Sequence, residues 1–209
     1  MLANLRQRRS PLRRPGLRGA LAAADQWLLR QLRTRGHGPG QDAVMRGLGV
    51  AGEWAWIWVA LGCAGAAADR RRRGRFLTAA AVGPAAVLVN YAVKVAVGRE
   101  RPLLEDHPPL ARAPSKLSFP SAHATSSLAA ATALARVEPR ARAPLYALAA
   151  AICFSRPYLG MHYPSDVLAG VVLGRALGRL VPGLEAAPQP AAAPGPAPAA
   201  PQPEREAAA

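Results

Sequence analysis

Two long apolar stretches constrain the fold of this chain more than any other feature. Residues 47–68 and residues 76–97 each contain 22 residues and a single charged side chain, Glu53 in the first and Lys94 in the second. A helix of about 20 apolar residues is long enough to cross the hydrocarbon core of a bilayer. We therefore predict that each stretch forms a membrane-spanning helix.

Three shorter apolar runs follow, at residues 121–135, 143–154 and 167–180. Apolar runs of this length are typical either of short spans or of buried helices in soluble proteins, and alanine richness weakens their hydropathy. On their own they predict helices without deciding between these two environments.

The charge of the chain also has two explanations. The 209 residues are 51% hydrophobic, yet 27 Lys and Arg against 12 Asp and Glu give a net charge of +15. This combination fits a nucleic-acid-binding protein or a membrane protein with arginines at the headgroups. The arginines gather in the connectors between apolar runs, namely at Arg70, Arg71, Arg72, Arg73, Arg75, Arg136, Arg140 and Arg142. The positive-inside rule places these connectors in the cytoplasm and residues 98–120 and 155–166 on the outer face.

A nucleic-acid partner is therefore not expected. A basic binding surface has no reason to be divided by 22-residue apolar stretches, and the sequence contains no finger, homeodomain or zipper motif. The two cysteines, Cys63 and Cys153, form no CxxC pair and lie in apolar runs, which excludes a disulfide-stapled fold.

The ends of the chain differ from its middle. Residues 1–16 form a basic N-terminal arm, and residues 17–46 contain a helix and a linker before the membrane domain of residues 47–184. The helix is amphipathic, with apolar residues at helical spacing: Leu17, Leu21, Ala24, Leu28 and Leu32. It is expected either to lie on the membrane surface or to pack on the bundle with a solvated basic face. Residues 185–209 are Ala/Pro-rich and predict a disordered extension.

The scarce ionisable residues point to a functional site. Lys94, His123, His162 and Asp166 all lie where an apolar run meets the proposed outer face. A single such residue is often a snorkelling lysine or a packed histidine. Four of them on one face predict a site, because ionisable groups are costly in apolar surroundings.

The residues around these four would bind an anion. Lys94 and Arg101 supply positive charge, and Arg156 offers a guanidinium suited to bidentate phosphate contact. Ser121 is predicted to cap a helix whose first amides, at Ala122 and His123, are unpaired and can bind an anion.

The two remaining residues, His162 and Asp166, would form a nucleophile and the carboxylate that orients it. Pro164 suits the first position of a helix, so Asp166 would lie one turn from His162 and accept a hydrogen bond from its ring. Cationic hydrogen-bond donors and two histidines together predict an enzyme that transfers a phosphoryl group without a metal or another cofactor. Glu105 and Asp106 are adjacent in a proline-rich loop and are interpreted as solvated.

Three motifs carry a resemblance to a known family. Lys94 to Pro102 reads K-x6-R-P, Pro120 to His123 reads P-S-A-H, and Ser155 to Asp166 reads S-R-x5-H-x3-D. In this order they resemble the three signature motifs of the type 2 phosphatidic acid phosphatase superfamily, which is related to the vanadium haloperoxidases. The resemblance spans roughly residues 47–180. Ala122 replaces the glycine usual in the second motif, and we expect an ordinary helical conformation there, which tolerates the extra methyl group.

The resemblance implies a role for each site residue. His162 would be the nucleophile that forms a phosphohistidine, Asp166 would orient it, and His123 would protonate the leaving alkoxide. The phosphoryl oxygens would be held by Lys94, Arg101, Ser121, Arg156 and the amide of Ala122.

The resemblance also implies the architecture. It raises the three short runs to spans, which gives an all-α polytopic membrane helix bundle of about five spans plus the N-terminal amphipathic helix. The site would lie between helices near the outer face of a bacterial plasma membrane.

The substrate is narrowed but not fixed by the sequence. Residues 115–126 and 159–166 are similar to small bacterial members of the superfamily, which favours a polyprenyl-linked phosphate such as decaprenylphosphoryl-phosphoribose. Polyprenyl pyrophosphate, phosphatidic acid and phosphatidylglycerophosphate are alternatives. Outside this activity, a vanadium-dependent haloperoxidase and a non-catalytic membrane scaffold are the rival functions. The expected partners are the lipid substrate and the bilayer, and the sequence does not give the oligomeric state.

Overall fold

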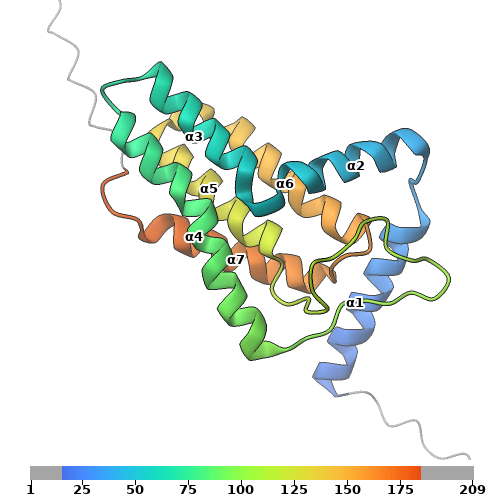
Figure 1. The fold of residues 1–209 in the computed structure, drawn as a ribbon. Coiled ribbons are helices and arrows are strands. Elements are labelled where there is room, and N and C mark those ends of the chain that lie inside the picture. The colour runs from blue at the N-terminus through green and yellow to red at the C-terminus, as the bar shows by residue number, and fades with distance from the viewer. Residues whose placement is uncertain (1–15, 185–209) are drawn as a thin grey trace, which may run out of the picture.

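The computed structural model describes residues 16–184 (Figure 1). The predicted disordered tail and all but the last residue of the predicted basic arm lie outside the described residues. Between residues 16 and 184 the regular elements are helices, together with one isolated bridge between Glu100 and Leu117. The helices are α1 (Leu17–Thr34), α2 (Pro39–Ala51), η1 (Glu53–Ala55), α3 (Trp56–Ala68), α4 (Arg73–Val97), α5 (Ala122–Val137), η2 (Pro139–Ala141), α6 (Arg142–Tyr158) and α7 (Pro164–Leu180). The predicted all-α fold is confirmed.

The third apolar run forms the central helix, α5, which contacts α3, α4, α6 and α7. Nearly every residue of α5 is buried, and most of its side chains are Ala, Ser or Thr. Alanine has the highest helix propensity, and small side chains let neighbouring helices approach closely. The run is therefore short and alanine-rich because it packs against protein on all sides.

The pair α5 and α7 shows the closest approach. Gly170, Gly174 and Gly178 recur every four residues along the face of α7 that meets α5, and all three are buried. A Cβ atom on Gly174 would overlap the backbone carbonyl oxygen of Thr125. This glycine stripe fixes the start of α7 beside the start of α5, which brings two of the predicted motifs together.

The first predicted span is broken within the apolar stretch, and its crossing of the membrane stays a prediction. Helix α2 ends at Ala51, and α3 begins only at Trp56, with the two segments bent by 55°. Trp54 and Ala55 adopt left-handed backbone conformations with φ of 49° and 65°, which are uncommon outside glycine. The break turns Glu53 and Trp54 toward the end of the bundle.

The second predicted span is confirmed as one helix, α4. Among the described helices, α4 is the one long and apolar enough to cross a membrane by itself. The bent segment from α2 through α3 reaches that length and hydropathy only as a pair. The other three runs form α5, α6 and α7, and the number of membrane crossings stays a prediction.

Helix α1 is confirmed, but the face that packs on the bundle was not anticipated. The buried residues of α1 are Asp25, Leu29 and Arg33, whereas Leu21 and Leu28 of the leucine stripe are exposed. Arg33 donates hydrogen bonds to the backbone carbonyl oxygens of Tyr158 and Pro108, at 3.2 and 2.7 Å. The helix therefore docks by a face that carries Asp25, Leu29 and Arg33, and Leu21 and Leu28 stay outside.

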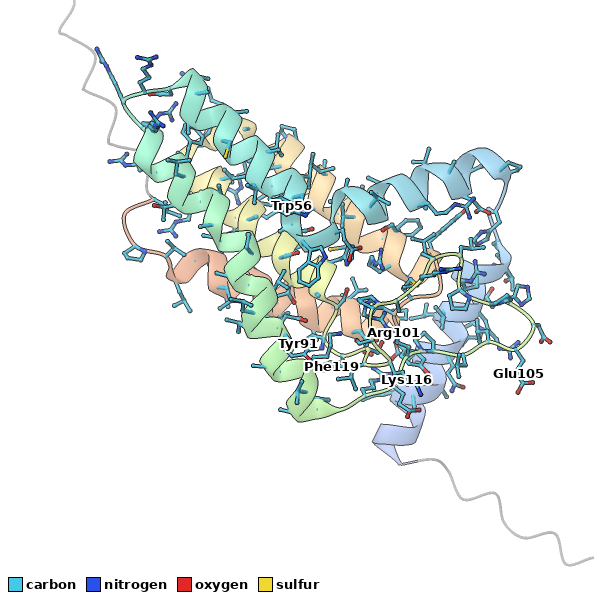
Figure 2. All side chains as sticks on the ribbon, in the orientation of Figure 1. Trp56, Tyr91, Arg101, Glu105, Lys116 and Phe119 are labelled. Carbon is cyan, nitrogen blue, oxygen red and sulfur yellow. The ribbon has the colours of Figure 1, made fainter. Side chains whose placement is uncertain are left out.

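The loop of residues 98–121 folds over the end of the bundle between α4 and α5 (Figure 1). Its tip carries Glu105 and Asp106, both exposed, and Glu105 points away from the helices (Figure 2). The prediction that these two acids are solvated is confirmed.

Candidate active site

A cavity of about 410 Å³ lies at this end of the bundle, under the loop of residues 98–121. Figure 2 shows Arg101 of the loop over the helix ends. The cavity is lined by six of the eight residues predicted for the site: Lys94, Arg101, Ala122, His123, Arg156 and His162. The structure thus brings residues of all three motifs into one cavity.

The predicted cationic residues Lys94, Arg101 and Arg156 line the cavity. The Nζ atom of Lys94 donates to the carbonyl oxygens of Ser118 and Leu117, at 3.0 and 3.3 Å. Arg101 donates from Nε to the carbonyl oxygen of Ser115 at 2.8 Å and from Nη1 to that of Met161 at 2.7 Å. The buried Nε of Arg156 has no hydrogen-bond partner within residues 16–184. These fixed positive charges suit an anionic ligand.

The start of α5 has the predicted geometry with one difference. Ser121 is the N-cap residue of α5, but its side chain makes no capping hydrogen bond. Its Oγ atom is buried and without a partner in the described part of the chain. Ala122 begins the helix with ordinary backbone angles and lines the cavity, as expected for a position that tolerates alanine.

His162 is held from behind by a serine that the motifs did not single out. The Nδ1 atom of His162 lies 3.2 Å from Oγ of Ser118 and 3.7 Å from Oδ2 of Asp166, and the Ser118 hydroxyl donates to that same carboxylate oxygen. The direct His162–Asp166 hydrogen bond predicted from the sequence is therefore replaced by a bridge through Ser118. On its other side, Nε2 of His162 lies 3.1 Å from Nη1 of Arg101.

These contacts fix which ring nitrogen carries the proton. Arginine can only donate, so Nε2 of His162 accepts and Nδ1 carries the hydrogen that faces Ser118. Burial lowers the pKa of His162 well below its ordinary value, and three neighbouring cations lower it further. The imidazole is thus neutral, with its lone pair on the side of the cavity.

Asp166 lies behind His162 and is fully buried. It is the third residue of α7, which begins at Pro164 as predicted, and its Oδ2 accepts from the backbone N–H of Tyr163 at 3.0 Å. Its Oδ1 accepts from Nη1 of Arg99 at 2.7 Å. Every oxygen of this carboxylate therefore has a donor, as a buried charge requires.

His123 also lines the cavity and is held by irregular backbone. Its Nε2 lies 2.9 Å from the carbonyl oxygen of Gly49 and 3.8 Å from Oε2 of Glu53. A Cβ atom on Gly52 would lie 2.8 Å from Cδ2 of His123, so glycine at that position leaves room for the ring. The break between α2 and α3 thus forms the pocket that holds His123.

The mouth of the cavity is apolar. Trp54, Leu88 and Tyr91 line it, with exposed fractions of 62%, 73% and 61%. Tyr91 points outward from α4 beside the loop (Figure 2). Within residues 16–184, no three His, Cys, Asp or Glu side chains lie close enough together to hold a metal ion.

Comparison with known proteins identifies the family. Residues 74–187 match the PAP2 superfamily. The chain belongs to the PAP2 superfamily. A curated relative, the decaprenylphosphoryl-5-phosphoribose phosphatase of Mycobacterium tuberculosis, is 44% identical over 147 residues, which cover 68% of this chain and 80% of that protein. The undecaprenyl-diphosphatase of Bacillus subtilis is 31% identical and covers 54% of this chain and 58% of that protein.

Two solved structures resemble this PAP2 member. The transmembrane PAP2-type phosphatidylglycerolphosphate phosphatase of Bacillus subtilis has a TM-score of 0.64 and 26% identity, covering 77% of this chain and 84% of that one. Aquifex aeolicus LpxE has a TM-score of 0.60 and 25% identity, covering 74% and 92%. The relatives whose names state an activity are phosphatases, in agreement with the predicted enzyme class and against the haloperoxidase and scaffold alternatives.

Three residues of this PAP2 site were missed by the motif analysis. Arg99 lies inside the first motif, and Ser118 lies three residues before Ser121. Glu53 is the one charge in the first apolar stretch, and that isolation was the signal that could have marked it. Their roles depend on contacts between distant segments, which motif spacing does not contain.

Proposed function

We propose that this PAP2 protein is an integral membrane phosphatase that hydrolyses a lipid-linked phosphate ester through a phosphohistidine on His162. One observation carries the proposal. The lone pair on Nε2 of His162 faces a cavity that is walled by Lys94, Arg101 and Arg156. This arrangement places a nucleophile where a phosphate would bind.

The first step transfers the phosphoryl group to the histidine. Nε2 of His162 attacks phosphorus, the N–P bond forms, and the bond from phosphorus to the alcohol oxygen breaks. Arg101 exchanges its contact with Nε2 for a phosphoryl oxygen, which frees the lone pair. The positive charge on the imidazole is stabilised by Asp166 through the hydroxyl of Ser118.

His123 acts as the general acid for the leaving alcohol. His123 begins in its protonated form, with Nε2–H on the carbonyl of Gly49, and gives the proton on Nδ1 to the departing alkoxide oxygen. A water molecule then attacks phosphorus while Nδ1 of the neutral His123 accepts the water's proton. The N–P bond breaks, and inorganic phosphate and neutral His162 are regenerated.

The phosphoryl oxygens are held by fixed donors throughout. Lys94, Arg101 and Arg156 supply charge, and the free hydroxyl of Ser121 and the N–H of Ala122 complete the set. Negative charge spreads over the equatorial oxygens in a phosphoryl transition state, and preorganised donors stabilise it.

The favoured substrate is a polyprenyl-linked phosphate, such as decaprenylphosphoryl-5-phosphoribose. The 44% identity to the phosphatase of that name supports it, and the apolar mouth at Trp54, Leu88 and Tyr91 suits a lipid chain. Phosphatidylglycerophosphate or phosphatidic acid is the second candidate, supported by the similarity to a phosphatidylglycerolphosphate phosphatase.

The test is phosphate release in detergent with a chelator present, from a panel containing these lipids. Metal-independent turnover is expected, with the highest kcat/KM on the polyprenyl-linked substrate. His162→Ala is expected to reduce turnover at least about a thousandfold, to the uncatalysed background. Full activity in His162→Ala, or a strict Mg²⁺ requirement, would overturn the mechanism.

The membrane arrangement is part of the proposal. We place about five spans in a bacterial plasma membrane, the cavity at the outer face, and the exposed apolar stripe of α1 in the outer headgroup layer. The arginine-rich turn between α3 and α4 lies at the far end of the bundle from the loop of residues 98–121 (Figure 1), as the positive-inside rule requires. In a Cys63→Ala background, a cysteine introduced at Pro108 should react with an impermeant reagent in intact cells. Protection of that cysteine would overturn the outward orientation.

A further inference from the structure

We propose that α1 completes the active site, because Asp25 holds Arg99 and Arg99 holds the carboxylate of Asp166. Asp25 and Arg99 are thereby positioning residues for the nucleophile His162. The inference rests on the proposed function and adds a helix to it. The family match begins at residue 74, so α1 contributes from outside the matched region.

Asp25 is buried next to the site and is not a surface residue. It is 6% exposed, and its Oδ1 accepts from the backbone N–H of Ser165 at 2.9 Å. Its Oδ2 accepts from Nη2 of Arg99 at 2.8 Å and from the hydroxyl of Ser165. Burial of a carboxylate is costly unless it is paired, and here both oxygens are paired with residues that adjoin Asp166.

Arg99 links the two carboxylates through the fork of its guanidinium. One branch, Nη2, contacts Asp25, and the other, Nη1, donates to Oδ1 of Asp166 and to Oγ of Ser165, both at 2.7 Å. Its plane lies over the ring of Tyr163, 4.1 Å from the centroid. Because a guanidinium is rigid and planar, fixing one branch fixes the other.

The position of Asp166 follows from this. The terminal torsion of an aspartate has a broad energy minimum, so its carboxylate is free to turn unless it is held. The backbone N–H of Tyr163 holds Oδ2 on one side, and Arg99 holds Oδ1 on the other, so that Oδ2 stays toward Ser118 and His162. The position of the carboxylate behind His162 therefore depends in part, through Arg99, on a residue of α1.

The way α1 packs supports a role beyond docking. The face of α1 that meets the bundle carries two charged residues, Asp25 and Arg33, on either side of the fully buried Leu29. This face is turned to the bundle where the catalytic motifs meet. Burial of charged groups is costly unless they are paired, so this face is selected by its polar contacts as well as by Leu29.

The test compares Asp25→Asn with wild type and with Arg30→Gln, which removes a charge from an exposed position of the same helix. Asp25→Asn is expected to lower kcat about 10- to 100-fold, the size typical of displaced positioning groups. The KM for the lipid phosphate and inhibition by orthovanadate should stay within about twofold, because the cations of the cavity are untouched. Single-turnover formation of the phosphoenzyme should slow by the same factor as kcat, a change that a loss of folded protein would not produce.

A double-mutant cycle tests whether Asp25 acts through Arg99. On an Arg99→Gln background, Asp25→Asn should have almost no further effect. Should Asp25→Asn fail to fold, Arg99→Lys serves instead, since it keeps the charge but cannot reach both carboxylates, and a similar fall in kcat is expected. Wild-type kcat in a folded variant, or additive losses in the cycle, overturns the inference. If wild type turns over and His162→Ala does not, the proposed function survives that result.

Discussion

The two histidines of the cavity are held in different ways. His162 is buried and is fixed by side chains, through Ser118 to Asp166. His123 is fixed by the backbone carbonyl of Gly49, beside the partly exposed Glu53. The carbonyl oxygen of Gly49 can only accept, so Nε2 of His123 carries a hydrogen and Nδ1 is left for proton transfer. The side chains around His162 instead leave its Nε2 lone pair toward the cavity.

This difference matches the two proposed tasks. A nucleophile needs a defined lone pair, and the network behind His162 supplies it whatever the substrate. A proton donor to the alcohol matters only when the leaving group is poor. A comparison of substrates with poor and good leaving groups therefore distinguishes the role of His123 from that of His162.

Among the substitutions that distinguish the two histidines, the largest effect is expected at His123. His123→Ala should lower kcat/KM for a lipid phosphate about 10²- to 10⁴-fold, the range typical of general acid–base catalysis. Hydrolysis of p-nitrophenyl phosphate should lose much less, because its phenolate leaves without protonation. Equal losses on both substrates would show that His123 does not act on the leaving group.

Substitution of the residues behind His162 should lower kcat by the same factor on every substrate. Ser118→Ala removes the bridge to Asp166 and should lower kcat about 10- to 100-fold on both the lipid phosphate and p-nitrophenyl phosphate. Ser115→Ala, whose contact to Arg101 uses only its backbone carbonyl, is the matched control in the same loop. A loss of kcat in Ser118→Ala that depends on the substrate would contradict the separate roles of His162 and His123.

A smaller effect is expected from closing the space beside His123. Gly52→Ala introduces a Cβ atom 2.8 Å from Cδ2 of His123 and from Cγ2 of Ile152, so the ring must shift. We expect about a tenfold loss of kcat/KM on the lipid phosphate and little change on p-nitrophenyl phosphate. Gly47→Ala is the control, because a Cβ atom there meets nothing within 4 Å.

The smallest effect concerns the charge of Glu53. This carboxylate lines a cavity that is otherwise cationic, and its repulsion should weaken the binding of free anions. Glu53→Gln should lower the inhibition constant of inorganic phosphate about two- to fivefold. Glu105→Gln, at the exposed tip of the loop, should leave that constant unchanged, and an increased constant in Glu53→Gln would assign the carboxylate an attractive role instead.

Much of the site could be predicted from the sequence because motif spacing determines local geometry. Pro164 begins α7 and places Asp166 one turn from His162, and Ser121 begins α5 with Ala122 at its first position. The cations Lys94, Arg101 and Arg156 line one cavity as expected. These are properties of single helix ends and their neighbouring residues.

The contacts that were not predicted all join segments distant in the chain. Asp25 meets Arg99 across 74 residues and Ser165 across 140. Helical periodicity identified the leucine stripe of α1 but did not predict which face meets the bundle, because the partners of Asp25 and Arg33 come from other elements. The break after α2 was also not predicted, because residues 47–68 form one apolar stretch with the single charge of Glu53.

The sequence by itself determined the helices, the family motifs and the chemistry they carry, since these depend on residue type and spacing along one segment. Only the tertiary structure decided that Ser118 stands between His162 and Asp166, that α1 reaches the site, and that Glu53 faces His123. Those contacts depend on where the ends of separate helices meet, and the packing of small residues between α5 and α7 sets that position.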